Sequence, residues 1–591
     1  MTQGSTLAPL RREPTESVVP RGIWAGRVTL SAGWLTVLLF GVLAFQRRWI
    51  GDDGMIVVRV VRQILAGAGP NYNPFERVEA ATSPLWVWLL AAFAYVRPGD
   101  VAAAAVALGL VLSIAGMGAG LAGCVRLHRA RGEIGVLVPL GALVPLAVGG
   151  FWDYATSGLE TGLSLCWFGY VWWLLVSINE RSGPGRVLAT AVVIGAGPLI
   201  RPDFLLASVV FGAAALLLTR PGWRRGLGYC GVGLVLPVGY EIFRAGYYGI
   251  LVPLPAVAKE ASSARWGQGV SYLNDFVDAY LLWIPLLMIA VIGTRLLDRI
   301  AIDRRTAVLL ATPVLAAVCL GIYLVRVGGD YMHARLWVPV LFALLLPVLM
   351  APLGRRRLES TGAALLAVWA LIAGLFLGPP YHGTQFGPTG LTDERDYETV
   401  AFADPHPSAE SRRKDTTLIA TLAALTDHRD RTLVLRTGTA ADGNLWTIPL
   451  APSLPDRGGY FYNNMGIAAA VMPLQGTVID VNGLATPLAG HLQLEQRARP
   501  GHEKWLPAAW VLARYADPAA IAMLPDTPDA TKAQVYAARD ALSCGRLAEL
   551  VDSTSRPLTP ERFWANLTGA LSRTGLRIPQ DPFAAKQRFC R

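Results

Sequence analysis

The sequence predicts a polytopic α-helical membrane protein that ends in a soluble α/β domain. Of its 591 residues, 53% are hydrophobic and only 16% are charged, whereas soluble domains are typically about 25% charged. Many apolar runs approach the roughly 20 residues that cross a bilayer, and arginine clusters separate them. This pattern ends near residue 378. The composition therefore excludes a disordered protein and argues against a purely soluble one.

Residues 30–378 form the predicted transmembrane domain, which we expect to cross the membrane eleven times. The predicted spans are 30–47, 101–124, 134–150, 162–179, 187–200, 202–219, 227–246, 279–297, 306–326, 335–352 and 361–378. The apolar segment 83–96 is too short for an untilted crossing at about 1.5 Å per residue. A crossing there would also turn every later arginine cluster outward. We therefore expect a re-entrant or interfacial element on the outer face, within a first outer loop over 48–100.

The arginine clusters give the orientation, because cytoplasmic loops carry an excess of Lys and Arg. The net charge of +11 is then an orientation signal, and nucleic-acid binding is excluded as its main cause. Residues 1–29 are polar and lack a cleavage site after a short apolar core, so we expect a cytoplasmic tail. Eleven crossings place the C-terminus outside, on the periplasmic face of the plasma membrane.

Residues 379–591 are expected to form a periplasmic domain of the carbohydrate-binding type, with mixed α/β structure. Strands are predicted at 432–436 and 477–481, and helices near 505–516, 531–550 and 560–573. Only two of the six cysteines, Cys544 and Cys590, lie in this region. Because two cysteines in an oxidising compartment can pair, we predict a disulfide that ties down the C-terminus.

Two adjacent carboxylates, Asp52 and Asp53, follow the first predicted span directly. Carboxylates beside a bilayer are costly unless they have partners or a function. An Asp that caps a helix explains one of them but not both. We interpret the pair as a general base or as the stabiliser of a cation-like transition state, with Mg²⁺, Mn²⁺ or Ca²⁺ as an optional ligand. The metal requirement stays open.

Farther along the first outer loop, amides and carboxylates alternate with aromatic residues. Such mixtures bind sugars, whose hydroxyls form hydrogen bonds and whose ring faces stack. A plain interfacial loop is the alternative. The candidate substrate-binding residues here are Asn73, Glu76, Arg77, Glu79 and Trp86.

Three charged residues of later outer loops are further candidates: Glu160 for contact with substrate, and Arg201 and Lys259 for binding an anionic donor. Glu160 begins a span, where a helix dipole also favours an acid. Arg201 faces outward against the positive-inside bias, either paired with Asp203 or binding an anion. Lys259 is the sole lysine before residue 414, and it either snorkels or holds a phosphate whose lipid tail lies in the membrane.

The last outer loop places Asp330, His333 and Arg335 within six residues, after the paired glycines 328 and 329. Paired glycines predict a tight loop. The three side chains are candidates for binding a phosphate or an acceptor, with capping and topology as the alternative.

All these charges map to one face of the predicted bundle, as expected for an enzyme that uses a lipid-phosphate donor. A transporter would place ionisable residues near mid-span and often show repeated halves, and the spans here are almost free of charge. A non-catalytic polymer-binding protein would leave the Asp pair and the Gly-Gly-Asp loop unexplained.

The motif combination resembles the terminal β-(1→2)-arabinofuranosyltransferase family (AftB) of mycolic-acid-bearing actinobacteria, within the GT-C glycosyltransferases. The matching segments are Asp52-Asp53, Asn73-Pro-Phe-Glu76-Arg77-Val-Glu79, Thr82-Ser-Pro-Leu-Trp86, Tyr248-Gly249, Pro253, Ala258-Lys259, Gly328-Gly329-Asp330-Tyr-Met-His333-Ala-Arg335, Val478-Ile-Asp480-Val-Asn-Gly483-Leu and Arg499-Pro500-Gly501-His502-Glu503-Lys504. The sequence departs mildly from the family pattern at Gly54, where Ala is expected, and at Asp203, where Glu is common.

The resemblance implies a GT-C-like fold and transfer of arabinofuranose from decaprenylphosphoryl-β-D-arabinofuranose. The implied acceptor is the non-reducing end of cell-wall arabinan in arabinogalactan, and also in lipoarabinomannan. A β-linked donor that gives a β-linked product means net retention. Another polyprenyl-phosphate-sugar transferase, such as a mannosyltransferase, is the alternative, and the oligomeric state stays open.

We assign roles on this basis. Asp52 or Asp53 stabilises an oxocarbenium-like centre and acts as base or nucleophile. Arg201, Lys259 and Arg335 hold the leaving phosphate, and His333 orients the phosphate or an acceptor hydroxyl. Asn73, Glu76, Arg77, Glu79, Trp86, Glu160 and Asp330 are expected to contact substrate.

Overall fold

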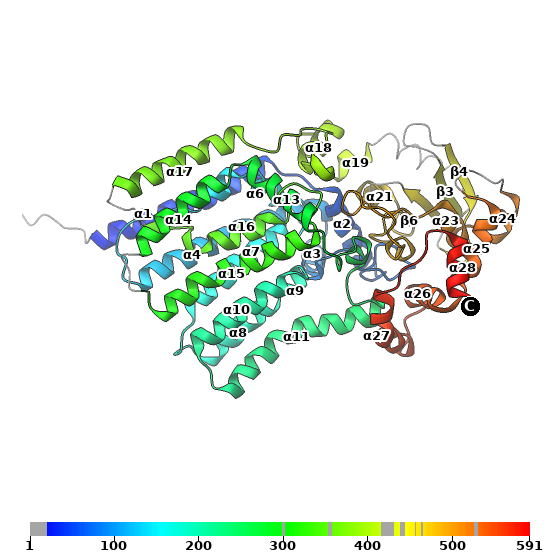
Figure 1. Cartoon of the computed structure of the whole chain (residues 1–591), viewed down its shortest axis with the longest axis horizontal. Helices are drawn as coiled ribbons and strands as arrows, with labels where there is room; N and C mark the ends of the chain where they lie inside the picture. The colour runs from blue at the N-terminus through cyan, green and yellow to red at the C-terminus, as the bar shows by residue number, and fades with distance from the viewer. Residues whose placement is uncertain are drawn as a thin grey trace, which may run out of the picture.

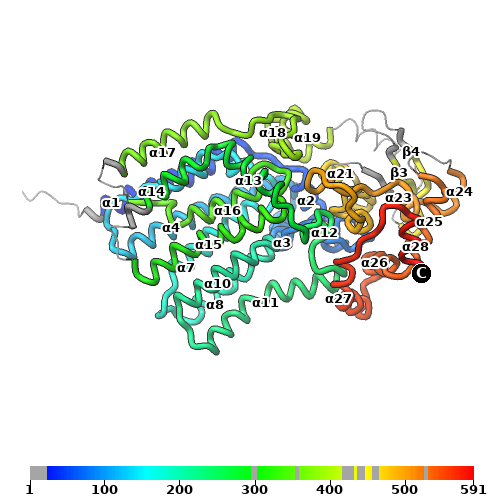
Figure 2. Tube along the Cα trace, in the orientation of Figure 1, coloured from blue at the N-terminus to red at the C-terminus, as the bar shows by residue number. Residues whose placement is uncertain are grey.

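A long helical bundle joins a C-terminal region of helices and sheet in the computed structural model (Figure 1). The structure describes residues 21–297, 302–352, 357–414, 431–437, 444–454, 457–461, 465–524 and 530–591. The trace in Figure 2 shows α2 (Asp52–Leu65) between the bundle and the C-terminal region, with α3 (Pro84–Val96) beside the bundle.

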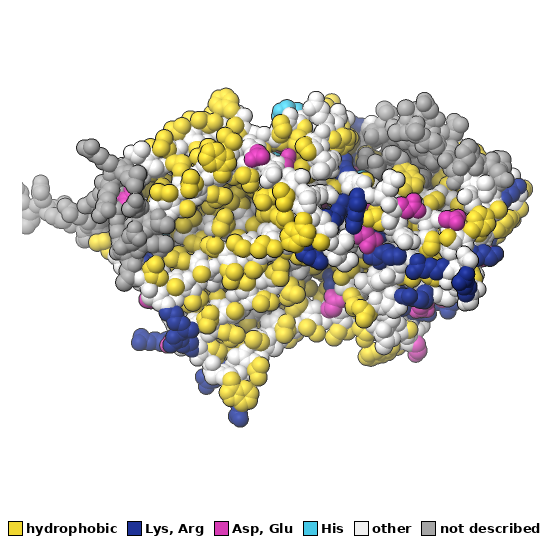
Figure 3. Space-filling view, viewed as in Figure 1, with side chains coloured by type: hydrophobic (Ala, Val, Ile, Leu, Met, Phe, Trp, Pro, Cys, Tyr) yellow, Lys and Arg dark blue, Asp and Glu magenta, His cyan; other side chains and the backbone are white. Residues whose placement is uncertain are grey.

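Within the described residues, five helices are long and apolar enough to span a membrane, and a sixth candidate is a pair bent by 78°. The five are α1 (Arg21–Gln46), α4 (Val101–Ala130), α11 (Trp223–Tyr248), α15 (Arg304–Val327) and α17 (Arg357–Phe376), and the bent pair is α13 (Trp266–Ala279) with α14 (Trp283–Leu297). Apolar side chains cover the visible bundle face, whereas charged ones gather over its two ends and the C-terminal region (Figure 3). The prediction of a helical membrane protein is confirmed.

The bundle also contains shorter apolar helices that coincide with predicted spans. They are α7 (Thr161–Ser177), α8 (Pro184–Gly195), α9 (Gly197–Ile200), α10 (Phe204–Thr219) and α16 (Trp337–Leu345), which η1 (Leu346–Val348) extends. The 13 residues of α3 (Pro84–Val96) follow α2 (Asp52–Leu65) in the first outer loop.

The predicted span 134–150 is not a continuous helix. It contains β1 (Leu137–Val138), α5 (Leu143–Ala147) and the start of α6 (Gly149–Tyr154), and β1 pairs with β2 (Ala351–Pro352). Pro139 and Pro145 lack the N–H that a helix interior needs. The segment still runs the length of the bundle, because β1 follows α4 whereas Asp153 binds Arg47 after the end of α1. A broken backbone is tolerated at membrane depth where protein surrounds it.

The C-terminal region is built on a four-stranded mixed sheet with the order β4-β3-β5-β6. Strand β3 is antiparallel to β4 and parallel to β5, which is parallel to β6. The strands are β3 (Thr432–Thr437), β4 (Asn444–Pro449), β5 (Arg457–Phe461) and β6 (Thr477–Asp480). The two strands predicted from the sequence are therefore confirmed as β3 and β6.

Helices surround this sheet, and those predicted near 505–516, 531–550 and 560–573 are present. The helices of the region are α18 (Glu394–Ala401), α19 (Ala409–Arg413), α21 (Met465–Val471), α22 (Pro487–Gly490), α23 (Ala508–Tyr515), α24 (Pro518–Met523), α25 (Lys532–Leu542), α26 (Gly545–Ser555), α27 (Pro560–Thr574) and α28 (Pro582–Phe589), with α12 (Leu254–Ala258) from the bundle beside α22. Cys544 and Cys590 form the predicted disulfide, with their Cα atoms 5.0 Å apart. It joins the start of α26 to the C-terminal end of the chain.

Candidate functional site

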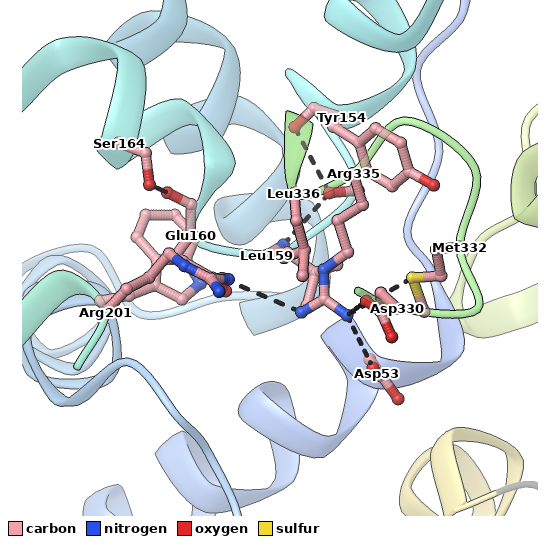
Figure 4. A network of polar contacts seen from close by, with 12 residues as sticks. Asp53, Tyr154, Leu159, Glu160, Ser164, Arg201, Asp330, Met332, Arg335 and Leu336 are labelled. Atoms are coloured by element: carbon pink, nitrogen blue, oxygen red, sulfur yellow. Dashed lines mark hydrogen bonds and ion pairs between the residues drawn. The ribbon is translucent and has the colours of Figure 1, made fainter. Parts of the chain in front are cut away.

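Seven charged side chains form a continuous network at the end of the bundle that meets the C-terminal region, and Figure 4 labels five of them. Arg335 lies at its centre and donates to Asp53 at 3.2 Å and to Asp330 at 3.0 Å. Glu160 lies 3.9 Å from Arg335 and accepts from Arg201 at 2.8 Å. Four of the sequence-predicted segments thus meet in one network, although they are distant along the chain.

Backbone geometry explains why the last outer loop can reach this network. Gly328 and Gly329 both have positive φ, at 93° and 69°, a conformation that glycine adopts without strain. A Cβ on Gly329 would lie 2.2 Å from the ring of Tyr272. The predicted tight loop is confirmed, and it turns Asp330 and Arg335 back toward α2.

Asp330 is held ionised by its neighbours. Burial alone would raise the pKa of Asp330, but the positive charges of Lys259 and Arg335 outweigh it and lower that pKa to about 2. The Nζ atom of Lys259 lies 3.5 Å from its carboxylate. Lys259 is therefore part of the same network, with 30% of its side chain exposed.

Two pockets lie on either side of Lys259. The first, the membrane-side pocket, lies beside the outer end of α15. Its lining residues are Thr82, Arg201, Pro202, Asp203, Pro253, Pro255, Ala256, Lys259, Ala261, Arg265, Tyr323, Leu324, Val327, Gly329, Asp330, Arg335, Leu336 and Pro500. Its wall combines four cations and two carboxylates with apolar side chains.

The second, the domain-side pocket, lies between α2 and the C-terminal region. Its lining residues are Asp52, Asp53, Ile56, Lys259, Tyr331, Phe386, Glu394, Tyr397, Met465, Asn482, Leu484, Arg499, Gly501 and His502. Acids, an amide and aromatic rings therefore surround it, and the pair Lys259–Asp330 separates it from the membrane-side pocket.

The two adjacent aspartates have different surroundings. Asp53 contacts Arg335 through one carboxylate oxygen and is 19% exposed. Both oxygens of Asp52 accept from the N-terminus of α21, from Gly466 N–H at 3.0 Å and Ile467 N–H at 3.2 Å. A Cβ on Gly466 would lie 2.3 Å from the Asp52 carbonyl oxygen, so glycine permits this close contact. Asp52 thus joins α2 to the C-terminal region.

The departure at Gly54 has a local steric cause. A Cβ at this position would lie 2.6 Å from the carbonyl oxygen of Ser157. The first turn of α2 packs against that backbone, and Gly51 N–H donates to the same oxygen at 2.9 Å. Glycine therefore sets how deeply Asp53 enters the site.

Two acids of α18 at this site, Glu394 and Glu398, were not predicted from the sequence. Glu394 lines the domain-side pocket 3.7 Å from Arg499, whereas Glu398 accepts from the Asp52 backbone N–H and pairs with Arg412. Burial raises the pKa of Glu398 to about 7 and raises that of Glu394 well above its usual range. The sequence around them is that of an ordinary amphipathic helix. Only their burial in the folded protein distinguishes them, and the sequence alone does not reveal it.

His333 lies apart from both pockets. Its Nδ1 atom is 2.6 Å from Asp275, and Tyr381 donates to the same carboxylate at 3.0 Å. His333 N–H donates to the Thr392 carbonyl oxygen. The side chain therefore braces the loop that carries Arg335.

Three candidates of the first outer loop bind backbone atoms. Asn73 exchanges two hydrogen bonds with the backbone of Val478, at 2.8 and 2.9 Å. Arg77 donates to carbonyl oxygens of Tyr247, Ser553 and Arg556, whereas the buried Trp86 donates to that of Gly158. The structure places these three side chains in packing contacts outside both pockets.

The two glutamates of the same segment are buried in ion pairs. Glu79 accepts from Arg244 at 2.6 Å and from the Tyr240 hydroxyl at 2.7 Å. Glu76 lies 3.4 Å from Arg514. Neither glutamate lines either of the two pockets.

A metal site is not preformed among the described residues, where no group of three or more His, Cys, Asp or Glu could hold an ion. Asp52 and Asp53, the two residues that the sequence offered for one, already bind α21 and Arg335.

Comparison with known proteins decides the family. Residues 454–588 match the family model described as AftB family C-terminal domain. The terminal β-(1→2)-arabinofuranosyltransferase of Mycobacterium tuberculosis is 35% identical over 93% of this chain and 96% of its own length. That of Corynebacterium glutamicum is 34% identical over 96% of this chain and 90% of its own length. The chain belongs to the terminal β-(1→2)-arabinofuranosyltransferase family. It is a membrane glycosyltransferase, and the resemblance drawn from the loop motifs is confirmed.

Proposed function

We propose that the protein transfers arabinofuranose from decaprenylphosphoryl-β-D-arabinofuranose to the non-reducing ends of cell-wall arabinan, forming terminal β-(1→2) linkages. The arabinan belongs to arabinogalactan and also to lipoarabinomannan. Residues 30–378 are the GT-C-like catalytic domain with eleven crossings, one of them the broken segment 134–150. Residues 379–591 are a periplasmic carbohydrate-binding domain. The observation that carries the proposal is the meeting of the two pockets at Lys259 and the Asp53–Arg335–Asp330 chain.

The membrane-side pocket fits a lipid phosphate. Lys259, Arg335, Arg201 and Arg265 lie on its wall beside apolar residues of α15. Charge-assisted hydrogen bonds to phosphate oxygens are short and strong. If a polyprenyl phosphate entered beside α15, its lipid chain would lie along the apolar residues and its phosphate would contact the cations. Its sugar would then point toward Asp53, which lies beside Arg335.

Asp53 is the residue we assign to the reacting carbon. In the transfer, the bond from the anomeric carbon to the phosphate oxygen breaks and its electron pair leaves with the phosphate. A new bond forms to the acceptor 2-hydroxyl, whose proton passes to a carboxylate or to the leaving phosphate. The negative charge of Asp53 stabilises the oxocarbenium-like centre, and Lys259 and Arg335 stabilise the charge that develops on the phosphate. Net retention also allows Asp53 to serve as nucleophile.

The domain-side pocket is the place for the acceptor. Glu394, Asn482 and His502 offer hydrogen-bonding groups, and Tyr331 and Phe386 offer ring faces. Arg499 stacks over both rings, 4.0 and 5.0 Å from their centroids. Such a wall suits a chain of furanose rings with free hydroxyls.

The proposal is tested with purified protein in lipid nanodiscs. Labelled decaprenylphosphoryl-arabinose and decaprenylphosphoryl-mannose are each offered with an arabinan oligosaccharide, with and without a chelator. We expect transfer of arabinose with a new β-(1→2) end, and at least about 100-fold slower use of mannose. Preferred transfer of mannose would contradict the donor assignment. Loss of transfer with chelator, restored by Mg²⁺, Mn²⁺ or Ca²⁺, would show that transfer requires a divalent metal.

A further inference from the structure

Helix α27 is fixed across the end of the lipid-facing helix α11 (Figure 1). Its inner face carries Asn566, which donates to the Gly246 carbonyl oxygen at 3.1 Å, and Arg573, which donates to that of Gly249 at 2.8 Å. The ring of Phe563 lies so close to Gly246 that a Cβ there would be 2.2 Å away. These contacts hold α27 to the bundle.

The outer face of α27 is uncovered, and it carries two large apolar side chains with Thr568 between them and Glu561 and Ser572 beside them. Trp564 is 62% exposed and Leu571 is 74% exposed. The two are seven residues apart, so they lie on the same side of the helix, two turns from each other. A helix that presents Trp and Leu beside polar residues on its exposed side is typical of helices at a membrane interface.

The position of α27 along α11 identifies the partner. The apolar window of α11 has no buried residue, and its exposed Leu234, Val238 and Ile242 face lipid. Glu241, whose side chain is 40% exposed, interrupts this apolar stretch just before Ile242 and pairs with the buried Arg244, and this ion pair marks the membrane boundary. Because α27 contacts α11 at Gly246, two residues after Arg244, it lies at the level of the lipid headgroups.

We propose that α27 is an interfacial helix whose face with Trp564 and Leu571 enters the headgroup–acyl boundary of the outer leaflet. Amphipathic helices bind bilayers in this way, with the apolar face about 5–10 Å into the boundary, and Trp is enriched at that depth. The helix then gives the C-terminal region a membrane contact that is separate from the spanning helices and fixes its tilt over the two pockets. This inference goes beyond sugar transfer and does not depend on it.

The test uses a nitroxide spin label on the full chain in nanodiscs of phosphatidylethanolamine and phosphatidylglycerol. Cys230 is exposed and is removed first as Cys230→Ser. The label is then placed at Leu571→Cys, or at Phe583→Cys as a matched control, since Phe583 is 50% exposed on α28 at the far end of the molecule. A high rate of collision between the nitroxide and oxygen indicates a lipid environment. A high rate of collision with a water-soluble nickel reagent indicates exposure to water.

We expect the label at 571 to collide at least about threefold more with oxygen than with nickel, and the label at 583 to show the reverse. A water-like label at 571 would overturn the proposal. A label at 571 protected from both reagents would also overturn it, because a protein partner or a second copy would then cover the helix. Both label positions are on the surface. The melting temperature of each variant, compared with that of the wild type, checks that the chain still folds with its Cys544–Cys590 disulfide.

Discussion

The two halves of the first outer loop look alike in sequence but use their charges in different ways. At the start of α2, Asp53 pairs with Arg335 beside two pockets. Between α2 and α3, Asn73 and Arg77 bind backbone carbonyls of the C-terminal region, and Glu79 is buried against Arg244. Charged residues at a membrane edge therefore indicate either a site or a joint between domains, and their partners decide which.

The aspartate pair repeats this difference over a single residue. Asp52 caps α21 from the C-terminal region, whereas Asp53 faces the chain of charges. One residue thus places the C-terminal region and the next lies at the proposed reaction centre.

Among changes near the start of α2, where Asp53 faces the two pockets, removing Arg335 is expected to have the largest effect. Arg335→Met leaves Asp330, Glu160 and Asp53 without their shared cation. Breaking a buried ion pair costs about 3–5 kcal/mol, so we expect a much lower melting temperature and no measurable transfer. Thermal unfolding followed by tryptophan fluorescence gives the first result, and a labelled-donor assay gives the second. Wild-type stability would contradict the central place of Arg335.

Lys259→Gln separates donor binding from folding. Because Lys259 is partly exposed but pairs with the buried Asp330, we expect a slightly lower melting temperature and a loss of about 10²–10³-fold in kcat/KM for the donor, as for the loss of one transition-state donor. Lys414→Gln is the matched control. An unchanged kcat/KM would remove Lys259 from phosphate binding.

Asn73→Ala is the corresponding change in the segment between α2 and α3, which contacts the C-terminal region. It removes two hydrogen bonds to Val478 and leaves backbone groups buried, at a cost of about 1–3 kcal/mol. We expect a lower melting temperature, with donor KM and kcat within about twofold of wild type where the protein is folded. A selective rise in KM at full stability would return Asn73 to the substrate site.

The smallest effect concerns pH. Burial raises the pKa of Glu398 to about 7, above the usual value of about 4.3, so the folded protein binds this proton more tightly than the unfolded chain. Wild type should therefore gain stability relative to Glu398→Gln as pH falls from about 7 to about 4. Melting temperatures across this range should show a relative gain of a few degrees. A relative loss on acidification would contradict the buried position of the carboxyl.

Much of the fold follows from local sequence. Apolar length predicts the long helices, and short runs rich in Val, Ile, Leu and Thr predict β3 and β6. Length cannot reveal that Pro139 and Pro145 break the segment 134–150, because its composition matches a span. The break depends on the burial that surrounding helices provide.

The candidate site is predictable where a charge stands out locally: Arg201 against the positive-inside bias, Lys259 as a lone lysine, and Asp330 after paired glycines. It was not predicted where the deciding partner is remote. Asn73 binds Val478, 405 residues away, and Glu394 reaches the domain-side pocket only because α18 folds back onto α2. Such contacts depend on tertiary packing, which one sequence does not display.

The central claim is that Asp53 acts at the reacting carbon and Asp52 holds the domains together. The direct measurement compares Asp53→Asn with Asp52→Asn in nanodiscs, with kcat for arabinose transfer and the melting temperature recorded for both. We expect Asp53→Asn to lose at least about 10²–10³-fold in kcat at nearly wild-type melting temperature, and Asp52→Asn to melt earlier. Full kcat for Asp53→Asn, or a selective loss of kcat at full stability for Asp52→Asn alone, would contradict the account.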